Sequence, residues 1–165
     1  MKPTLPYLIL LLGVSLWCTM LVLPPLAASS GHEVVAHQLY RSFSPICHQF
    51  ESRSLHLFGY KQAVCSRCSA IYFGFFVGVL LVPILSQRYN RQTIKLLLIA
   101  SAPMLIDVLC DLSGFHASNI FTRLMTGSFF GIVSALILSP YIIEALTSLL
   151  VKQNNNQKAS YEFKT

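Results

Sequence analysis

Charged residues are scarce in this chain, and acidic residues are the scarcest of them. Only 11% of the 165 residues are charged and only six are Asp or Glu, whereas an ordinary soluble domain has about 25% charged residues. Hydrophobic residues make up 54% of the chain. A soluble domain of this size could not bury so much apolar surface, because its surface-to-volume ratio is too high. The composition therefore predicts an integral membrane protein.

The chain also lacks the common short motifs of hydrolases and nucleotide-binding proteins. It contains no Gly-x-Ser-x-Gly, no His-Glu-x-x-His and no phosphate-cradling glycine loop, so these chemistries have no support. The net charge of +6 would be compatible with binding to nucleic acid. However, the basic residues are scattered between apolar runs and form no stripe with interleaved aromatics, so we expect no nucleic-acid partner.

Four apolar runs have the length of about 20 residues that a membrane-spanning helix needs. They cover residues 5–28, 69–86, 94–112 and 120–143. The first run is longer than the core of a signal peptide, which has about 7 to 15 residues, so we expect an uncleaved helix rather than a leader. The predicted fold class is all-α: a polytopic four-helix membrane bundle, one domain over residues 1–151, with a disordered polar tail at 152–165.

A loop over residues 29–68 separates the first two predicted spans. Ser30 and Glu33 have the spacing of a capping box, which marks the start of a helix. Val35, Leu39 and Phe43 follow at four-residue intervals. We therefore expect a short amphipathic helix here, on the membrane or packed on the bundle.

Two pairs of glycines at four-residue spacing lie within the predicted spans: Gly74 and Gly78 in the second, Gly127 and Gly131 in the fourth. Small residues at this spacing let helix backbones approach closely in lipid. The expected partner of the chain is the lipid bilayer. The two glycine faces could in addition contact other membrane subunits or a second copy of the chain.

The distribution of basic residues gives a modest preference for one orientation. With the N-terminus in the cytoplasm, seven basic residues lie inside and five outside, and cytoplasmic segments usually carry the excess. The inner set is Lys2, Arg88, Arg91, Lys95, Lys152, Lys158 and Lys164, and the outer set is Arg41, Arg53, Lys61, Arg67 and Arg123. We expect both termini in the cytoplasm of a bacterial inner membrane and the 29–68 loop outside.

The strongest local signal in the loop is the series Cys47-His48 and Cys65-Ser66-Arg67-Cys68. Two cysteines separated by two residues form half of a tetrahedral zinc site, and the second half commonly lies about 15 to 20 residues away. The predicted ligands are Cys47, His48, Cys65 and Cys68. Adjacent side chains diverge, so Cys47 and His48 compete, and His37, His56 or His116 is the alternative fourth ligand. Thiolate ligands favour zinc, although iron or copper(I) also bind them.

A polar cluster is expected on the same side of the membrane as these cysteines. With four spans, the loop 29–68 and the turn 113–119 emerge together. Asp107 and Asp111 are four residues apart and share one helix face, and an arginine within a span needs a partner. We therefore expect Arg123 to pair with Asp107 or Asp111. The full supporting cluster is Arg53, Arg67, Asp107, Asp111, His116, Asn119 and Arg123.

Two other functions remain open from the residues alone. A Cys-x-x-Cys pair at a helix N-terminus favours the thiolate, which suits a thiol–disulfide oxidoreductase coupled to quinone. The vitamin K epoxide reductases, which are four-helix membrane enzymes of this kind, are similar to the chain in size and motif placement. Such enzymes generally need a second cysteine pair, and the loop offers only Cys47. The third alternative is a small transporter or a membrane assembly factor.

Several of these residues together resemble the signature of a membrane-protein family catalogued as domain of unknown function 2085. The resemblance covers roughly residues 40–135. It is carried by Cys47-His48-Gln49, Arg53-Ser54, Gly59, Cys65-Ser66-Arg67-Cys68-Ser69-Ala70-Ile71-Tyr72-Phe73-Gly74, Asn119, Arg123, Thr126 and Gly127. Ala70 stands where the family pattern leads us to expect glycine. The resemblance implies a membrane architecture and this choice of residues, and it implies no reaction.

Overall fold

The computed structural model describes residues 5–85, 92–113 and 119–162. These residues are mostly helical. The elements, in chain order, are α1 (Leu5–Ser29), α2 (Glu33–Phe43), the single 3-10 turn η1 (Glu51–Arg53), β1 (Ser54–Leu57), β2 (Tyr60–Cys65), α3 (Ser66–Leu85), α4 (Gln92–Leu112) and α5 (Ile120–Glu162).

Three of these helices, α1, α3 and α5, are long and apolar enough to cross a membrane. α1, α3 and α5 contain nearly all residues of the first, second and fourth predicted runs. The third predicted run forms α4, which is not among these three within the described residues. The membrane class is thus supported, and three of the four predicted spans have the length and apolar composition of a membrane-spanning helix.

The loop between α1 and α3 is more structured than an all-α fold predicts. Residues 54–65 form an antiparallel hairpin of β1 and β2, in which Leu57 pairs with Tyr60. The turn residues Phe58 and Gly59 both have positive φ, 56° and 82°, which matches the twist of a two-residue hairpin turn. Because such turns are usually recognised by Asn-Gly or Asp-Gly, the Phe-Gly pair gave a weak sequence signal.

The predicted amphipathic helix is α2, which ends at Phe43 immediately before Ser44-Pro45. It buries Ala36 and Phe43. The predicted capping box is wrong: His32 is the N-cap residue and no side chain caps the helix. The hydroxyl of Ser30 instead donates to the carbonyl of Leu26 at 2.9 Å, because α1 continues to Ser29.

Helices α3 and α5 pack closely on each other, and the four glycines of the two Gly-x-x-x-Gly pairs lie between them. A Cβ added to Gly74 would lie 2.5 Å from the carbonyl oxygen of Ser128, and one added to Gly127 would lie 2.8 Å from that of Arg67. The backbones therefore touch where side chains would hold them apart. The glycine faces, which we expected to be available for contacts with other chains, are covered by contacts between α3 and α5 of the same chain.

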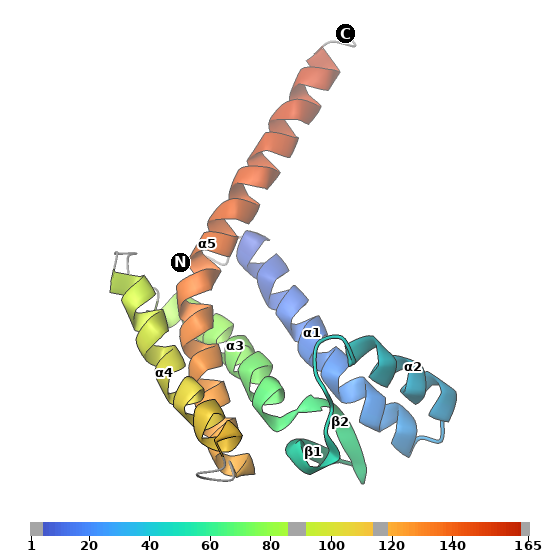
Figure 1. The fold of residues 1–165 in the computed structure, drawn as a ribbon. Helices are drawn as coiled ribbons and strands as arrows, with labels where there is room; N and C mark the ends of the chain where they lie inside the picture. Colours follow the sequence, from blue (N-terminus) through green and yellow to red (C-terminus); the bar gives the residue numbers. More distant parts are fainter. Residues whose placement is uncertain (1–4, 86–91, 114–118, 163–165) are drawn as a thin grey trace.

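The last helix is longer than expected. α5 runs to Glu162, whereas the sequence predicted a disordered tail from residue 152. The segment contains Gln, Lys, Ala and Glu, which have high helix propensity, so the helix continues beyond its apolar part. Figure 1 shows this end of α5 projecting away from the other helices.

The end of α1, the hairpin, the start of α3, the end of α4 and the start of α5 all gather at one end of the molecule (Figure 1). This follows from the up-and-down order of the helices, since α3 leaves this end and α4 returns to it. The loop with the cysteines and the acidic end of α4 are therefore neighbours.

Candidate functional site

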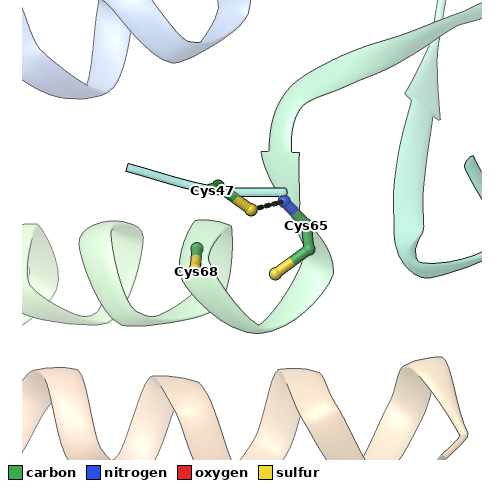
Figure 2. A group of neighbouring side chains, drawn as sticks. All are labelled: Cys47, Cys65 and Cys68. Atoms are coloured by element: carbon green, nitrogen blue, oxygen red, sulfur yellow. Dashed lines mark hydrogen bonds between the residues drawn. The ribbon is translucent and has the colours of Figure 1, made fainter. Parts of the chain in front are cut away.

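Three cysteines meet at this end of the bundle. The sulfurs of Cys47, Cys65 and Cys68 all lie within 4.8 Å of one another, and Figure 2 shows the three side chains converging. The backbone N–H of Cys65 donates to the sulfur of Cys47 at 3.2 Å. Among the described residues, this is the group whose atoms are placed to share one metal ion.

Each cysteine comes from a different element. Cys47 follows α2, Cys65 is the last residue of β2, and Cys68 lies in the first turn of α3. Cys47 is buried in a cluster with Leu21, Phe43, Ala63 and Val64, against which Cys65, Cys68 and Tyr72 pack. Apolar packing between the loop and α1 thus fixes the positions of the sulfurs before any ligand is bound.

The thiol of Cys65 has a strongly lowered pKa. A hydrogen bond from the Cys68 side chain, helped by bonds from Cys47 and from backbone groups and opposed by burial, lowers the pKa of Cys65 to about 5. A cysteine thiol ordinarily has a pKa of about 8.5. The lowered pKa favours the thiolate of Cys65, which is the form that binds metals and acts as a nucleophile.

Among the residues that the structure describes, no histidine joins the three-cysteine group. His48, the fourth predicted ligand, lies outside the three-cysteine group, and its exposed ring stacks on Phe50 with centroids 5.9 Å apart. Of the alternatives, His37 lines a different cavity and His56 contacts Glu51 at 3.4 Å. His116 lies outside the described residues.

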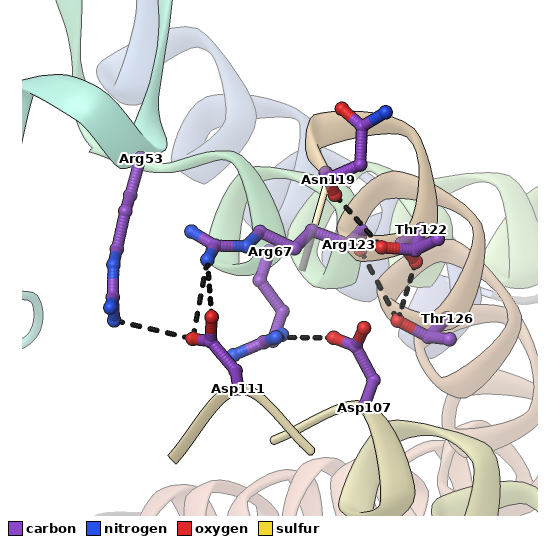
Figure 3. A network of polar contacts seen from close by, with 8 residues as sticks. All are labelled: Arg53, Arg67, Asp107, Asp111, Asn119, Thr122, Arg123 and Thr126. Carbon is purple, nitrogen blue, oxygen red and sulfur yellow. Dashed lines mark hydrogen bonds and ion pairs between the residues drawn. The ribbon is translucent and has the colours of Figure 1, made fainter. Parts of the chain in front are cut away.

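A network of ion pairs joins the loop, α3, α4 and α5 beside the cysteines (Figure 3). Arg67 of α3 pairs with Asp107. Arg123 of α5 contacts both oxygens of Asp111 at 3.2 Å, which is one of the two partners expected from the sequence. Arg53 from the loop reaches the same carboxylate at 3.5 Å. The network therefore ties the loop, α3 and α5 to the last turns of α4.

Asn119 acts through its backbone at the start of α5. Its carbonyl oxygen accepts hydrogen bonds from the Arg123 N–H at 3.1 Å and from the Thr122 hydroxyl at 2.9 Å, as Figure 3 shows. The first turn of α5, which positions Arg123, is stabilised in this way. Thr126 similarly donates to the carbonyl of Thr122 at 2.8 Å.

A cavity of about 330 Å³ opens next to the sulfurs. All three clustered cysteines contribute to its wall, together with Arg53, Arg67 and Arg123. His48, Gln49 and Phe50 also line it. The thiols and the arginines, which are far apart in the sequence, thus face one space.

One buried polar contact at the site was missed in the sequence. Gln62, only 2% exposed, accepts a 2.6 Å hydrogen bond from the hydroxyl of Ser69. It fastens β2 to the first turn of α3 and so fixes Cys65 relative to Cys68. A glutamine inside an apolar stretch signals such a role only once the hairpin is recognised.

The fold and the site together define a helical membrane protein with a thiol cluster at one end of its bundle. Residues 47–137 match the family described as "Predicted membrane protein (DUF2085)", and the chain belongs to this family. It is 31% identical over 147 residues to an uncharacterized protein of Methanocaldococcus jannaschii, covering 85% of this chain and 94% of that protein.

A second relative, an uncharacterized protein of Methanothermobacter thermautotrophicus, is 35% identical over 85 residues, covering 52% of this chain and 77% of the relative. Both relatives are archaeal, so the comparisons give no support to the bacterial inner membrane that we expected. No solved structure matches the chain.

Proposed function

We propose that this protein binds a thiophilic metal ion, zinc-like in its preferences, through Cys47, Cys65 and Cys68. The observation that carries the proposal is the convergence of the three sulfurs within 4.8 Å. Two sulfurs bound to one zinc at about 2.3 Å lie roughly 3.8 Å apart in a tetrahedron. Closure by about 1 Å would therefore complete the thiolate set.

The chemistry of the site supports a metal in two further ways. The lowered pKa of Cys65 favours its thiolate, and ligands must be deprotonated to bind. The N–H of Cys65 holds the sulfur of Cys47 in place, in the way that outer hydrogen bonds orient metal ligands. With three protein ligands the fourth position would open to the cavity, where His48 or water could occupy it.

The experiment is to purify the protein without reductant and to measure bound metal by elemental analysis and free thiols by titration. About one metal per chain, with all thiols titratable after unfolding, is the expected result. Metal-free protein with two of these thiols in a disulfide would overturn the metal proposal.

A thiol–disulfide oxidoreductase that passes electrons to a quinone is the second candidate. The observation that favours it is the Cys65 thiolate directly before α3, hydrogen-bonded by the Cys68 thiol, since a low-pKa Cys-x-x-Cys pair is typical of redox sites. Oxidation of the Cys65 thiolate and the Cys68 thiol to a disulfide would release two electrons and one proton, and these together with one proton from solvent reduce one quinone to a quinol. The same thiol titration separates this candidate from the first.

We also propose that α4 is the fourth membrane span. Large apolar side chains on this helix are exposed, among them Leu98, Ile99 and Ile106, each more than 60%. Contiguous exposed apolar surface of this kind suits lipid rather than water. The charged groups at its end, Asp107 and Asp111, are paired within the bundle, as ionisable groups near lipid require.

The proposed orientation places both termini in the cytoplasm and the cysteine site outside. Arg53, Arg67 and Arg123 have carboxylate partners that join the loop and helices, which weakens them as topology signals. Of the other outer basic residues, Lys61 contacts Glu51 in the loop and Arg41 is exposed on α2. In a cysteine-free background, Phe58→Cys should react with a membrane-impermeant maleimide on intact cells. Lys152→Cys should react only after permeabilisation, and the reverse pattern would invert the orientation.

A further inference from the structure

The cavity beside the cysteines is lined by cationic groups and by no carboxylate. Arg53, Arg67 and Arg123 all contribute to its wall, and none of the described Asp or Glu residues does. Asp107 and Asp111 instead contact these arginines from α4 (Figure 3). The carboxylates of α4 position the guanidinium groups, and the arginines line the cavity.

Guanidinium groups outnumber the carboxylates around this cavity, and the Cys65 thiol, whose pKa is lowered, is the third acidic group there. Three guanidinium groups share two carboxylates, since Arg53 and Arg123 both contact Asp111. The nearest other acidic residue, Glu51, contacts His56 and Lys61. In addition, α3 and α5 both begin at this end, so the positive ends of two helix dipoles point toward the site.

We propose that this cavity binds a small phosphate-type oxyanion through Arg53 and Arg123. Guanidinium groups match phosphate in geometry and charge and bind it with paired hydrogen bonds. The volume of about 330 Å³ falls in the range of small-molecule sites, roughly 300–1,000 Å³, so it accommodates a phosphate with an attached organic group. The phosphate could belong to a soluble compound or to a lipid headgroup at the membrane face.

Arg53 is the adjustable part of this site and Arg123 the fixed part. The Arg53 side chain is 46% exposed, and its guanidinium lies 5.8 Å from the centre of the Phe50 ring. Phe50 in turn stacks on His48, so three side chains form one wall. Arg123 is 6% exposed and is held by Asp111. His48 is also a candidate for the fourth metal position, whereas Arg53 and Arg123 are not metal ligands, so the anion site goes beyond the metal function and is tested separately.

The test uses the full chain in a neutral detergent and a phosphate-free buffer. Isothermal titration measures binding of two probes, inorganic phosphate and dihexanoyl phosphatidic acid below its micelle concentration. We expect saturable binding with one site per chain for at least one probe. Binding of inorganic phosphate would assign a soluble ligand, and binding of the lipid alone would assign a headgroup. Absence of saturable binding of both probes would overturn the proposal.

Arg53→Gln is the decisive variant, and Arg41→Gln is its matched control, because Arg41 is an exposed arginine on α2 that does not line the cavity. Arg53→Gln should weaken binding about tenfold or more, as loss of a charge-assisted hydrogen bond does, and Arg41→Gln should leave it unchanged. Equal weakening by both variants would show general electrostatic attraction and would contradict a built site.

Two further measurements keep this test independent of folding and of the metal. Arg53→Lys retains the charge and loses the forked geometry, so it should weaken phosphate binding several-fold while the helix content stays that of the wild type. Metal content of each variant, measured in parallel, should match the wild type. Loss of anion binding with unchanged metal content separates the anion site from the metal site, and unchanged anion binding in both Arg53 variants would overturn it.

Discussion

The backbone N–H of Cys65 donates a hydrogen bond to the sulfur of Cys47, eighteen residues earlier, at 3.2 Å. This bond crosses from the end of the hairpin to the segment after α2 (Figure 2). It places the isolated cysteine beside the Cys-x-x-Cys pair, and the predicted chemistry of the site depends on that contact.

Replacing Cys47 should therefore remove bound metal. We expect Cys47→Ser to lower the metal content from about one per chain to well below half, because two thiolates seldom hold zinc at a site that needs four ligands. Cys110→Ser is the control, since Cys110 lies in α4 and outside the three-cysteine group. Elemental analysis after gel filtration gives the result, and full metal content in Cys47→Ser would exclude Cys47 as a ligand.

Alkylation of the metal-free protein should reveal the acidic thiol. The low pKa of Cys65, about 5, predicts that its reaction with iodoacetamide stays fast down to about pH 5, whereas an ordinary thiol loses reactivity below about pH 8.5. Cys68→Ala should raise this midpoint, because the Cys68 hydrogen bond is the main cause of the shift. Peptide mass spectrometry over a pH series measures it, and an unshifted midpoint would refute the thiolate assignment.

The same pKa difference makes stability depend on pH. Because the folded pKa of Cys65 lies below the unfolded value, the unfolded state holds more protons between about pH 5 and pH 9. The contribution of Cys65 is thus fully present above the unfolded pKa and is lost as the pH falls through the folded pKa. Denaturant unfolding of metal-free wild type and Cys65→Ala should show a wild-type advantage that grows with pH across this window. A constant difference would contradict the linkage.

The ion pair of Asp111 at the end of α4 should contribute more to the free energy of unfolding than the exposed ion pair of Glu51 in the loop. Asp111→Asn leaves Arg123, 6% exposed, without its carboxylate, and breaking a buried pair commonly costs about 3 kcal/mol or more. Glu51→Gln removes the contact to Lys61, in which the Glu51 side chain is 73% exposed, and should cost less than about 1 kcal/mol. Thermal unfolding in detergent compares the two variants, and equal losses would show that the α4 network is not structural.

Close packing of α3 on α5 should make Gly74 intolerant of a methyl group. A Cβ at Gly74 would lie 2.5 Å from a backbone oxygen of Ser128, and backbone cannot move aside cheaply. We expect Gly74→Ala to lower the free energy of unfolding by roughly 1–3 kcal/mol, as overpacking does. A Cβ at Gly13 meets nothing within 4 Å, so Gly13→Ala should have no such effect. Equal stability of the two variants would contradict the observed helix contact.

Much of the architecture could be read from local pattern. Apolar runs gave the bounds of α1 and α3 to within about three residues, because a lipid-facing helix needs a continuous apolar stretch of defined length. The hairpin was missed, since its Phe58-Gly59 turn lacks the usual residues and its strands are short. Helical residues beyond 152 were also missed, because composition alone does not separate a polar helix from a disordered tail.

The sequence by itself determined that the chain is a helical membrane protein and which residues are candidate metal ligands, since burial in lipid follows from residue polarity and the ability to ligate a metal follows from the side-chain atoms. Only the tertiary structure decided the partners. It joined Cys47 to the Cys65–Cys68 pair, left His48 stacked on Phe50, and paired Arg123 with Asp111. Such choices depend on distances of a few ångströms between elements remote in sequence, which packing sets and local pattern does not encode.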